Sequence, residues 1–224
     1  GENPYKSPTD MGVNMVGNCI IDDEACCEAS KQEIIRRYYT CLNQYVQGDA
    51  SEDEVANIEL LMQQAKITTD YRAVTQAAKA RAEKAKVPTA AIELADGTII
   101  TSETTPLLGT SAALLLNATK HLAGIDHKVK LIPKEMIEPI QQMKVNLLSG
   151  NNPRLHTDEV LVALAMLSKD DENCKKALEQ LANLKGCQVH TSVMLSEVDR
   201  KIFKKLGVDL TCEPVYKKQK PLIG

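Results

Sequence analysis

Three polar segments of the sequence carry side chains that could bind and act on a small molecule. They are the opening segment, residues 102–105 and residues 151–156. Lysine and arginine in such segments neutralise phosphate, while serine, threonine and asparagine supply directional hydrogen bonds. They form a site only if folding brings the three segments together. The candidate ligand-binding residues are Lys6, Ser7, Thr9, Asp10, Asn14, Ser102, Thr104, Asn151, Arg154 and His156.

His156 is the best of the four histidines for chemistry, because it stands beside Arg154 in a loop-like segment. His121 and His127 flank the end of a predicted helix, where capping of free carbonyls competes with a ligand role. His190 lies in a predicted strand, and we expect it to be half-buried with its hydrogen bonds satisfied. No catalytic set of residues can be assigned from these positions alone.

Several familiar motifs are missing from the sequence. It has no Gly-x-Ser-x-Gly elbow, no dinucleotide fingerprint and no Walker loop, so this segment predicts no nucleotide-binding loop of its own. The seven cysteines are odd in number, and the adjacent Cys26 and Cys27 have the wrong spacing for a zinc knuckle. Reduced thiols in the core and a cytoplasmic location are therefore expected.

The composition of the chain argues against nucleic acids and membranes as binding partners. Of the 224 residues, 27 are Lys or Arg and 30 are Asp or Glu, which gives a net charge of −3 and argues against a nucleic-acid-binding protein. Hydrophobic residues make up 43%, as in an ordinary globular chain. The longest apolar run, Val160 to Leu167, is too short to cross a bilayer. We expect no membrane partner, and the sequence leaves homo-oligomerisation open.

Residues 1–88 are predicted to form an opening loop and a helical subdomain. Apolar residues recur at helical spacing over about 24–47, and Ser51 to Glu54 is a capping box that opens a second helix. A third helix, rich in alanine, is predicted from about residue 70 to 86 and ends before Pro88. Since the turns between them are short and polar, the three helices should pack on one another.

Residues 89–224 alternate strand and helix, which predicts a three-layer α/β domain with a mixed sheet. The Asp96-Gly97 turn indicates a β-hairpin, because glycine tolerates the positive φ of a tight turn. The order of elements, with a helical insertion near 157–185, resembles the cytidine-deaminase-like arrangement. Strands are expected at 90–94, 98–101, 128–132, 187–194 and 208–212, and helices at 110–122, 133–148, 158–168, 171–184 and from 196 to Gly207.

A zinc deaminase would need metal ligands at two helix starts of this arrangement. Residues 105–112, after the hairpin, contain no His, Cys or Glu. In the segment from Pro133 to Ile137, Lys134 and Ile137 stand where the two cysteines would be. The sequence therefore predicts no bound metal and no zinc deaminase activity.

The opening run from Asn3 to Asn14, the stretch from Ala29 to Tyr38 and the closing run from Leu206 to Pro214 resemble a bacterial family. It is the domain of unknown function numbered eighteen forty-six. Since its members are about twice as long, the resemblance implies that this chain is a carboxyl-terminal half. It also implies a missing amino-terminal half that looks like a nucleotide-binding domain.

Two hypotheses about function follow from this resemblance and from the polar segments. The first makes the chain a binding and assembly module for its own amino-terminal half, which would hold any nucleotide cofactor. The second has this half contribute to an enzyme site for a phosphorylated or nucleotide-like small molecule. Under the first hypothesis the opening loop would fold against the other half.

Overall fold

The computed structural model describes residues 22–216 of the chain. It divides into two compact units, residues 1–72 and residues 73–224. The predicted boundary at residue 88 groups the third helix with the first two, whereas this helix belongs to the second unit. Within the described residues no helix is both long and apolar enough to cross a membrane.

The first unit is built on two helices, α1 (Asp23–Gln47) and α2 (Glu52–Gln64), followed by a short 3-10 turn, η2 (Thr69–Tyr71). Ser51 caps α2 in the predicted capping box with Glu54, and Gly48 ends α1 with a φ of 85°. A small core between the helices holds the unit together. It consists of Ile35, Tyr39, Met62 and Ile67.

The second unit contains a four-stranded mixed sheet in the order β2-β1-β3-β4. β1 (Thr89–Glu93) pairs antiparallel with β2 (Ile99–Glu103) and with β3 (Gln188–Thr191), and β3 pairs parallel with β4 (Asp209–Cys212). The hairpin prediction is confirmed, with Gly97 at a φ of 81° in its turn. The described residues thus form a mixed α/β structure of eight helices and four strands.

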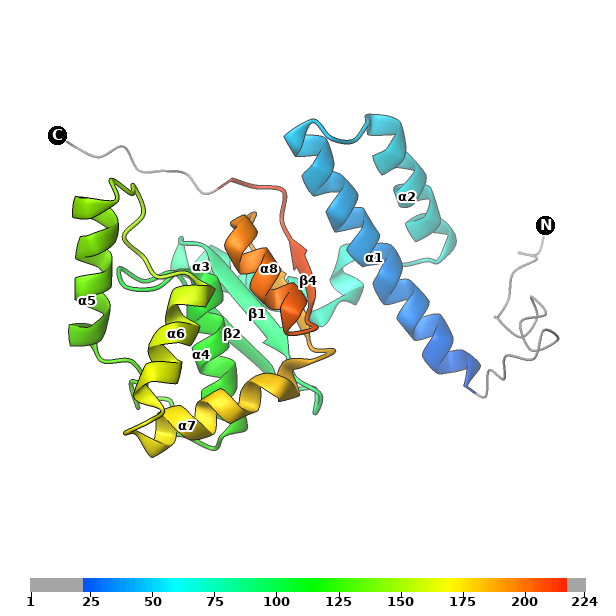
Figure 1. Cartoon of the computed structure of the whole chain (residues 1–224). Helices are drawn as coiled ribbons and strands as arrows, with labels where there is room; N and C mark the ends of the chain where they lie inside the picture. Colours follow the sequence, from blue (N-terminus) through cyan, green and yellow to red (C-terminus); the bar gives the residue numbers. More distant parts are fainter. Residues whose placement is uncertain (1–21, 217–224) are drawn as a thin grey trace. The chain divides into compact units, whose positions relative to one another are not determined.

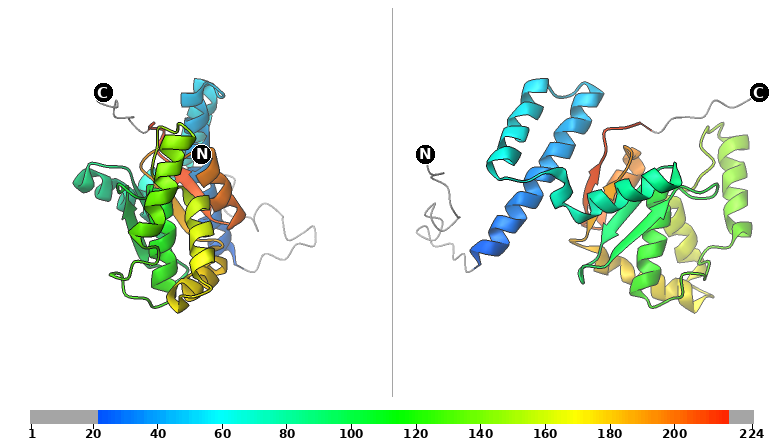
Figure 2. Two further views of the ribbon diagram at one scale, coloured as in Figure 1. Left: turned by 60° about the vertical axis from the view of Figure 1, so that its left-hand side comes forward. Right: turned by 180° about the vertical axis from the view of Figure 1, so that it is seen from behind.

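The sheet lies between two helical layers (Figures 1 and 2), and side chains of β1 alternate between them. Ala91 packs against α3 (Ala73–Ala85) on one face, whereas Ile92 packs on the other against α4 (Thr110–Leu122) and α8 (Glu197–Lys205). The right-hand view of Figure 2 shows α3 in front of the sheet with α4 behind it. Phe203 of α8 and Leu114 of α4 are fully buried in this larger core.

The predicted strand at 128–132 is wrong, because this segment forms turns and irregular backbone. Its carbonyl groups are satisfied by side chains: Lys120 Nζ donates to Val129 O at 3.0 Å, and Cys174 Sγ donates to Leu131 O at 3.1 Å. Ile132 is buried in a second core, away from the sheet. Strand-like alternation was therefore a sign of packing and not of a β-ladder.

The named elements between β2 and β3 are all helical. After α4, α5 (Lys134–Gln142) runs into a π-helix, η3 (Met143–Leu147), and α6 (Thr157–Leu167), α7 (Glu172–Glu179) and the 3-10 turn η4 (Gln180–Leu184) follow. α5, α6 and α7 share the second core with α4. Its buried residues include Ala112, Leu116, Ile137, Leu155, Val160, Leu164 and Cys174.

Candidate functional site

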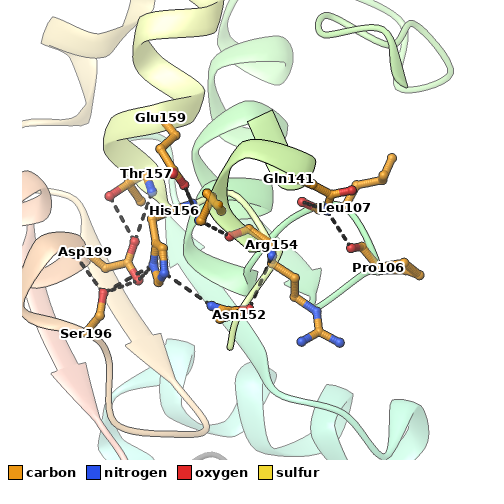
Figure 3. Close-up of polar contacts among 11 residues, drawn as sticks. Pro106, Leu107, Gln141, Asn152, Arg154, His156, Thr157, Glu159, Ser196 and Asp199 are labelled. Atoms are coloured by element: carbon orange, nitrogen blue, oxygen red, sulfur yellow. Dashed lines mark hydrogen bonds and ion pairs between the residues drawn. The ribbon is translucent and has the colours of Figure 1, made fainter. Parts of the chain in front are cut away.

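The loop between η3 and α6 is fixed at its base by the π-helix. Lys144 Nζ donates to the carbonyl oxygen of Arg154 at 2.7 Å. The Gly150 amide donates to the Lys144 carbonyl oxygen at 2.8 Å. A Cβ at position 150 would lie 2.9 Å from that oxygen, so a larger residue would push the loop away. π-helical turns are frequent at functional sites, and this one supports the loop that carries Asn152, Arg154 and His156 (Figure 3).

His156 stands at the start of α6 with both ring nitrogens engaged. Its Nδ1 lies 3.2 Å from Asp199 Oδ2, and its Nε2 lies 3.2 Å from Asn152 Nδ2. Asn152 Oδ1 accepts from the Arg154 amide at 3.3 Å, so the Asn152 NH2 group faces the ring. The hydrogen bonds therefore assign the proton to Nδ1, which donates to Asp199, and leave Nε2 as the basic nitrogen.

Asp199 is the buried partner, with an exposed fraction of 2%. Its carboxylate also accepts from Thr157 N at 3.1 Å, from Thr157 Oγ1 at 3.0 Å and from Ser196 Oγ at 2.8 Å. Burial alone would raise the pKa of Asp199, but the hydrogen bonds from His156, Thr157 and Ser196 outweigh it and hold that pKa below its usual value. The carboxylate is therefore ionised at neutral pH.

Arg154 lies beside the imidazole on the same loop. Its Nε donates to the Thr105 carbonyl oxygen at 2.7 Å, which ties the loop to residues 105–109. Gln141 Nε2 donates to the carbonyl oxygen of Pro106 at 3.0 Å and steadies that second segment. The two terminal nitrogens of Arg154 make no hydrogen bond to the described part of the chain, and Figure 3 shows them directed away from His156 and Asp199.

The arrangement suits acid–base chemistry and not nucleophilic attack by serine. In a serine triad the hydroxyl lies on Nε2 and the carboxylate on Nδ1. Here Ser196 Oγ is 3.4 Å from Nδ1 of His156, the same nitrogen that faces Asp199. A basic Nε2 backed by an ionised carboxylate is instead the geometry of a general base that can return its proton as an acid.

The structure brings two of the predicted segments together. Arg154 and His156 lie in the cluster, and residue 105 reaches it through its carbonyl. Ser102 is buried and donates to the carbonyl oxygen of Thr110, so it serves the start of α4. Thr104 Oγ1 is buried without a partner among the described residues, and Asn151 is exposed. Lys6, Ser7, Thr9, Asp10 and Asn14 lie outside the described residues.

Sequence reasoning missed Asp199 and the residues that share its hydrogen bonds. The run from Ser196 to Asp199 was interpreted only as a helix start, which it also is, since the Asp199 amide donates to Ser196 Oγ at 3.2 Å. Asp199 lies 43 residues beyond His156 in the chain. A capping motif does not indicate that its acidic member contacts a distant histidine, so no local signal could have found the pair.

The structure also changes which segments correspond to the two metal-binding helix starts of a zinc deaminase. Because no strand lies between α4 and α5, the segment from Pro133 to Ile137 does not follow a third strand. Along the chain the third strand is β3 and the next helix is α8, which Ser196 caps and whose first turn contains Asp199. Among residues 22–216 no group of three or more His, Cys, Asp or Glu side chains is placed to bind a metal ion.

The other histidines have different surroundings. His190 is fully buried, and not half-buried as predicted, with Nδ1 at 2.9 Å from Thr211 Oγ1 and Nε2 at 3.1 Å from Glu213. His121 and His127 line a hollow of about 480 Å³ at the carboxyl end of α4, together with Ile100, Asn117, Lys120 and Ile125. Burial lowers the pKa of Lys120 there. This hollow lies at the opposite end of α4 from residues 105–109.

Comparison with known proteins supplies a family and no activity. Residues 1–66 match the model described as "Domain of unknown function DUF1846, N-terminal", and residues 70–221 match "Domain of unknown function DUF1846, C-terminal". A UPF0371 protein of Corynebacterium urealyticum is 52% identical over 96% of this chain, and one of Streptococcus pyogenes is 48% identical over 98%. The chain spans 44% of the length of each of these relatives.

These matches correct the sequence analysis in one respect. The chain is not a carboxyl-terminal half, because residues 1–66 match the amino-terminal model of the family. Both hypotheses about function assumed that this chain is a carboxyl-terminal half. One made it a module for a separate amino-terminal half, and the other had it contribute to an enzyme site beside that half. Both are therefore wrong in that form. The names of the relatives state no function. With its two parts matched by the two models of one family, the chain belongs to the DUF1846 family.

Proposed function

We propose that this protein is an enzyme in whose reaction His156 transfers a proton, with Asp199 as the residue that orients and stabilises the imidazole. The observation that carries the proposal is the 3.2 Å hydrogen bond between His156 Nδ1 and the buried Asp199 carboxylate. Nε2 removes a proton from an O–H, N–H or C–H group of the substrate. The imidazolium that results is stabilised by Asp199 and then returns the proton.

Exposure of the two side chains supports this division of roles. The side chain of His156 is 25% exposed, whereas that of Asp199 is 3% exposed. A substrate can thus reach the imidazole but not the carboxylate. Asn152 occupies Nε2 through a neutral hydrogen bond of 3.2 Å, and giving up such a bond costs about 1 kcal/mol. A substrate group that reached Nε2 would therefore displace Asn152 at small cost.

A purely structural role for the cluster makes a different prediction. Asp199 already caps α6 by accepting from the Thr157 amide and hydroxyl. That role needs the carboxylate but not the imidazole, whose Nε2 contacts only a loop asparagine. Replacing His156 by glutamine would then lower stability through the altered contact with Asp199 and leave chemistry unchanged.

The test is a search for turnover in deuterated water. The protein is incubated with a bacterial metabolite extract, and mass spectrometry follows metabolites that are consumed or that gain deuterium. The variants are His156→Gln and, as a matched control, His127→Gln, in which an exposed histidine is replaced. We expect the wild type and His127→Gln to turn over the same metabolite, and His156→Gln to be slower by about 100-fold or more. An unchanged rate in His156→Gln would refute the proposal.

We also propose two finer points about the fold and the location of the protein. The hairpin followed by an antiparallel third strand and a parallel fourth supports a cytidine-deaminase-like arrangement of the sheet. Cys41, Cys174, Cys187 and Cys212 are buried free thiols, which supports a reducing, cytoplasmic setting.

A further inference from the structure

We infer that the substrate of this site carries a carboxylate group, which the guanidinium of Arg154 binds while His156 acts on a neighbouring part of the molecule. The inference rests on the proposed function, because it assigns the substrate class of the same site. Two observations support it. Arg154 is held through its Nε while its terminal nitrogens have no partner among the described residues, and the neighbouring amides and Lys144 already form hydrogen bonds within the protein.

The guanidinium of Arg154 is pre-organised for ligand binding. Its Nε is held by the Thr105 carbonyl oxygen at 2.7 Å, and the Arg154 carbonyl oxygen is held by Lys144 at 2.7 Å. Residue 154 is therefore anchored through its backbone and through its side chain. The terminal nitrogens, which are not used by the described part of the chain, are free to form two parallel hydrogen bonds. Little side-chain entropy is lost when such an anchored arginine binds.

Nearby carboxylates of the protein do not compete for this arginine. Glu159 accepts from Lys144 Nζ at 2.7 Å and from the His156 amide at 2.8 Å. Asp199 accepts from His156, Thr157 and Ser196. Among the described residues both of these acidic groups are engaged elsewhere, so we expect a bound molecule to supply the acidic partner of Arg154.

The same contacts favour carboxylate over phosphate. A phosphate site normally offers several converging backbone amides at a helix start. At the start of α6 the His156 amide donates to Glu159 and the Thr157 amide donates to Asp199, so these amides are not available. The ammonium group of Lys144 is engaged by Glu159. What remains is one planar fork, which pairs with the two oxygens of a carboxylate but offers a phosphate neither the converging amides nor the ammonium group that would bind its remaining oxygens.

Asn152 connects the backbone of Arg154 with the ring of His156. Its Oδ1 accepts from the Arg154 amide, and its Nδ2 contacts His156 Nε2. Figure 3 shows Asn152 lying between the two side chains. Because the guanidinium is directed away from His156, an acid that pairs with Arg154 has to extend back past Asn152 and displace its amide to present a second group to Nε2.

Nuclear magnetic resonance titration tests this inference without knowledge of the reaction. The probes are propionate and succinate, with propionamide as the uncharged match for propionate and inorganic phosphate as the competing anion, all at constant ionic strength. The resonances of Arg154 Nε and of the His156 ring report binding. We expect saturable shifts with the two carboxylates below about 100 mM, weaker binding of phosphate and none of propionamide.

Variants decide whether Arg154 is responsible. In Arg154→Lys the charge remains but the fork is lost, and we expect carboxylate affinity to fall by about 10-fold, with a larger loss in Arg154→Gln. Arg37→Gln, which changes an arginine on the exposed surface of α1, should bind as the wild type does. If Arg154→Gln does not fold, Arg154→Lys alone decides the question.

Three results would overturn the inference. They are tighter binding of phosphate than of carboxylates, no saturable shift with either carboxylate, and unchanged carboxylate affinity in the Arg154 variants. Failure here is distinct from failure of the proposed function, which depends on turnover by His156→Gln. A protein that needs His156 for turnover but binds no carboxylate would keep the first proposal and lose the second.

Discussion

Replacing Asp199 by asparagine should reverse the tautomer of His156. The carboxylate can only accept, so it keeps the ring proton on Nδ1, 3.2 Å away. In Asp199→Asn the Oδ1 atom can still accept from Thr157, which turns the new NH2 group toward His156 Nδ1. Nδ1 must then accept, and the proton moves to Nε2. The basic nitrogen that would face a substrate is lost although the shape of the site is preserved.

The energetic cost follows from the hydrogen bonds at this carboxylate. It accepts from His156, twice from Thr157, and from Ser196. Asparagine keeps the two bonds from Thr157 and replaces one of the others with reversed polarity. Bonds to a charged group contribute about 1.5–3 kcal/mol each, so a loss of about 2 kcal/mol in unfolding free energy is expected at neutral pH.

The effect should depend on pH in a defined direction. The pKa of Asp199 in the folded protein lies below its usual value of about 4. The carboxylate therefore contributes its full stabilisation above about pH 4, and this is lost as the pH falls through the lower pKa of the folded state. The stability difference between wild type and Asp199→Asn should accordingly shrink below about pH 4.

Two measurements check this prediction. Nitrogen NMR of the histidine ring distinguishes a protonated from an unprotonated ring nitrogen, and should show the proton on Nδ1 in the wild type and on Nε2 in Asp199→Asn. Urea denaturation at a series of pH values gives the stability difference. If the variant kept the proton on Nδ1, or lost no stability at neutral pH, the assigned role of Asp199 would be incorrect.

Three further predictions concern the elements that position the site and the fold. Lys144→Met should lower the unfolding free energy by about 1–3 kcal/mol in urea denaturation, because Glu159 loses its ammonium partner; an unchanged midpoint would contradict this. Phe203→Ala should cost about 3–5 kcal/mol by leaving a cavity in the main core, whereas Val198→Ala on the exposed side of the same helix should cost far less, and equal losses would disprove the assignment of faces. Ser51→Ala should cost about 1 kcal/mol in thermal unfolding through loss of the α2 capping box, and an unchanged unfolding temperature would show that the box does not stabilise the helix.

The sequence predicted those elements whose cause is local. The hairpin follows from the Asp96-Gly97 turn between two apolar runs, and α2 begins where the capping box from Ser51 to Glu54 places it. Both depend on residues within a few positions of one another, so both elements can be predicted without knowledge of the fold. The strand expected at 128–132 fails because side chains outside the segment occupy its carbonyl groups: Lys120 on the preceding helix and Cys174, which is 43 residues beyond Leu131.

For the candidate site, the sequence alone determined that His156 and Arg154 share one polar loop. Only the tertiary structure decided that the first turn of α8 would bring Asp199 to that histidine, across 43 residues of chain. A side chain's neighbours in sequence determine its secondary structure. The tautomer and basicity of an imidazole depend instead on which buried group packs against it, and that is decided when α6 and α8 pack together.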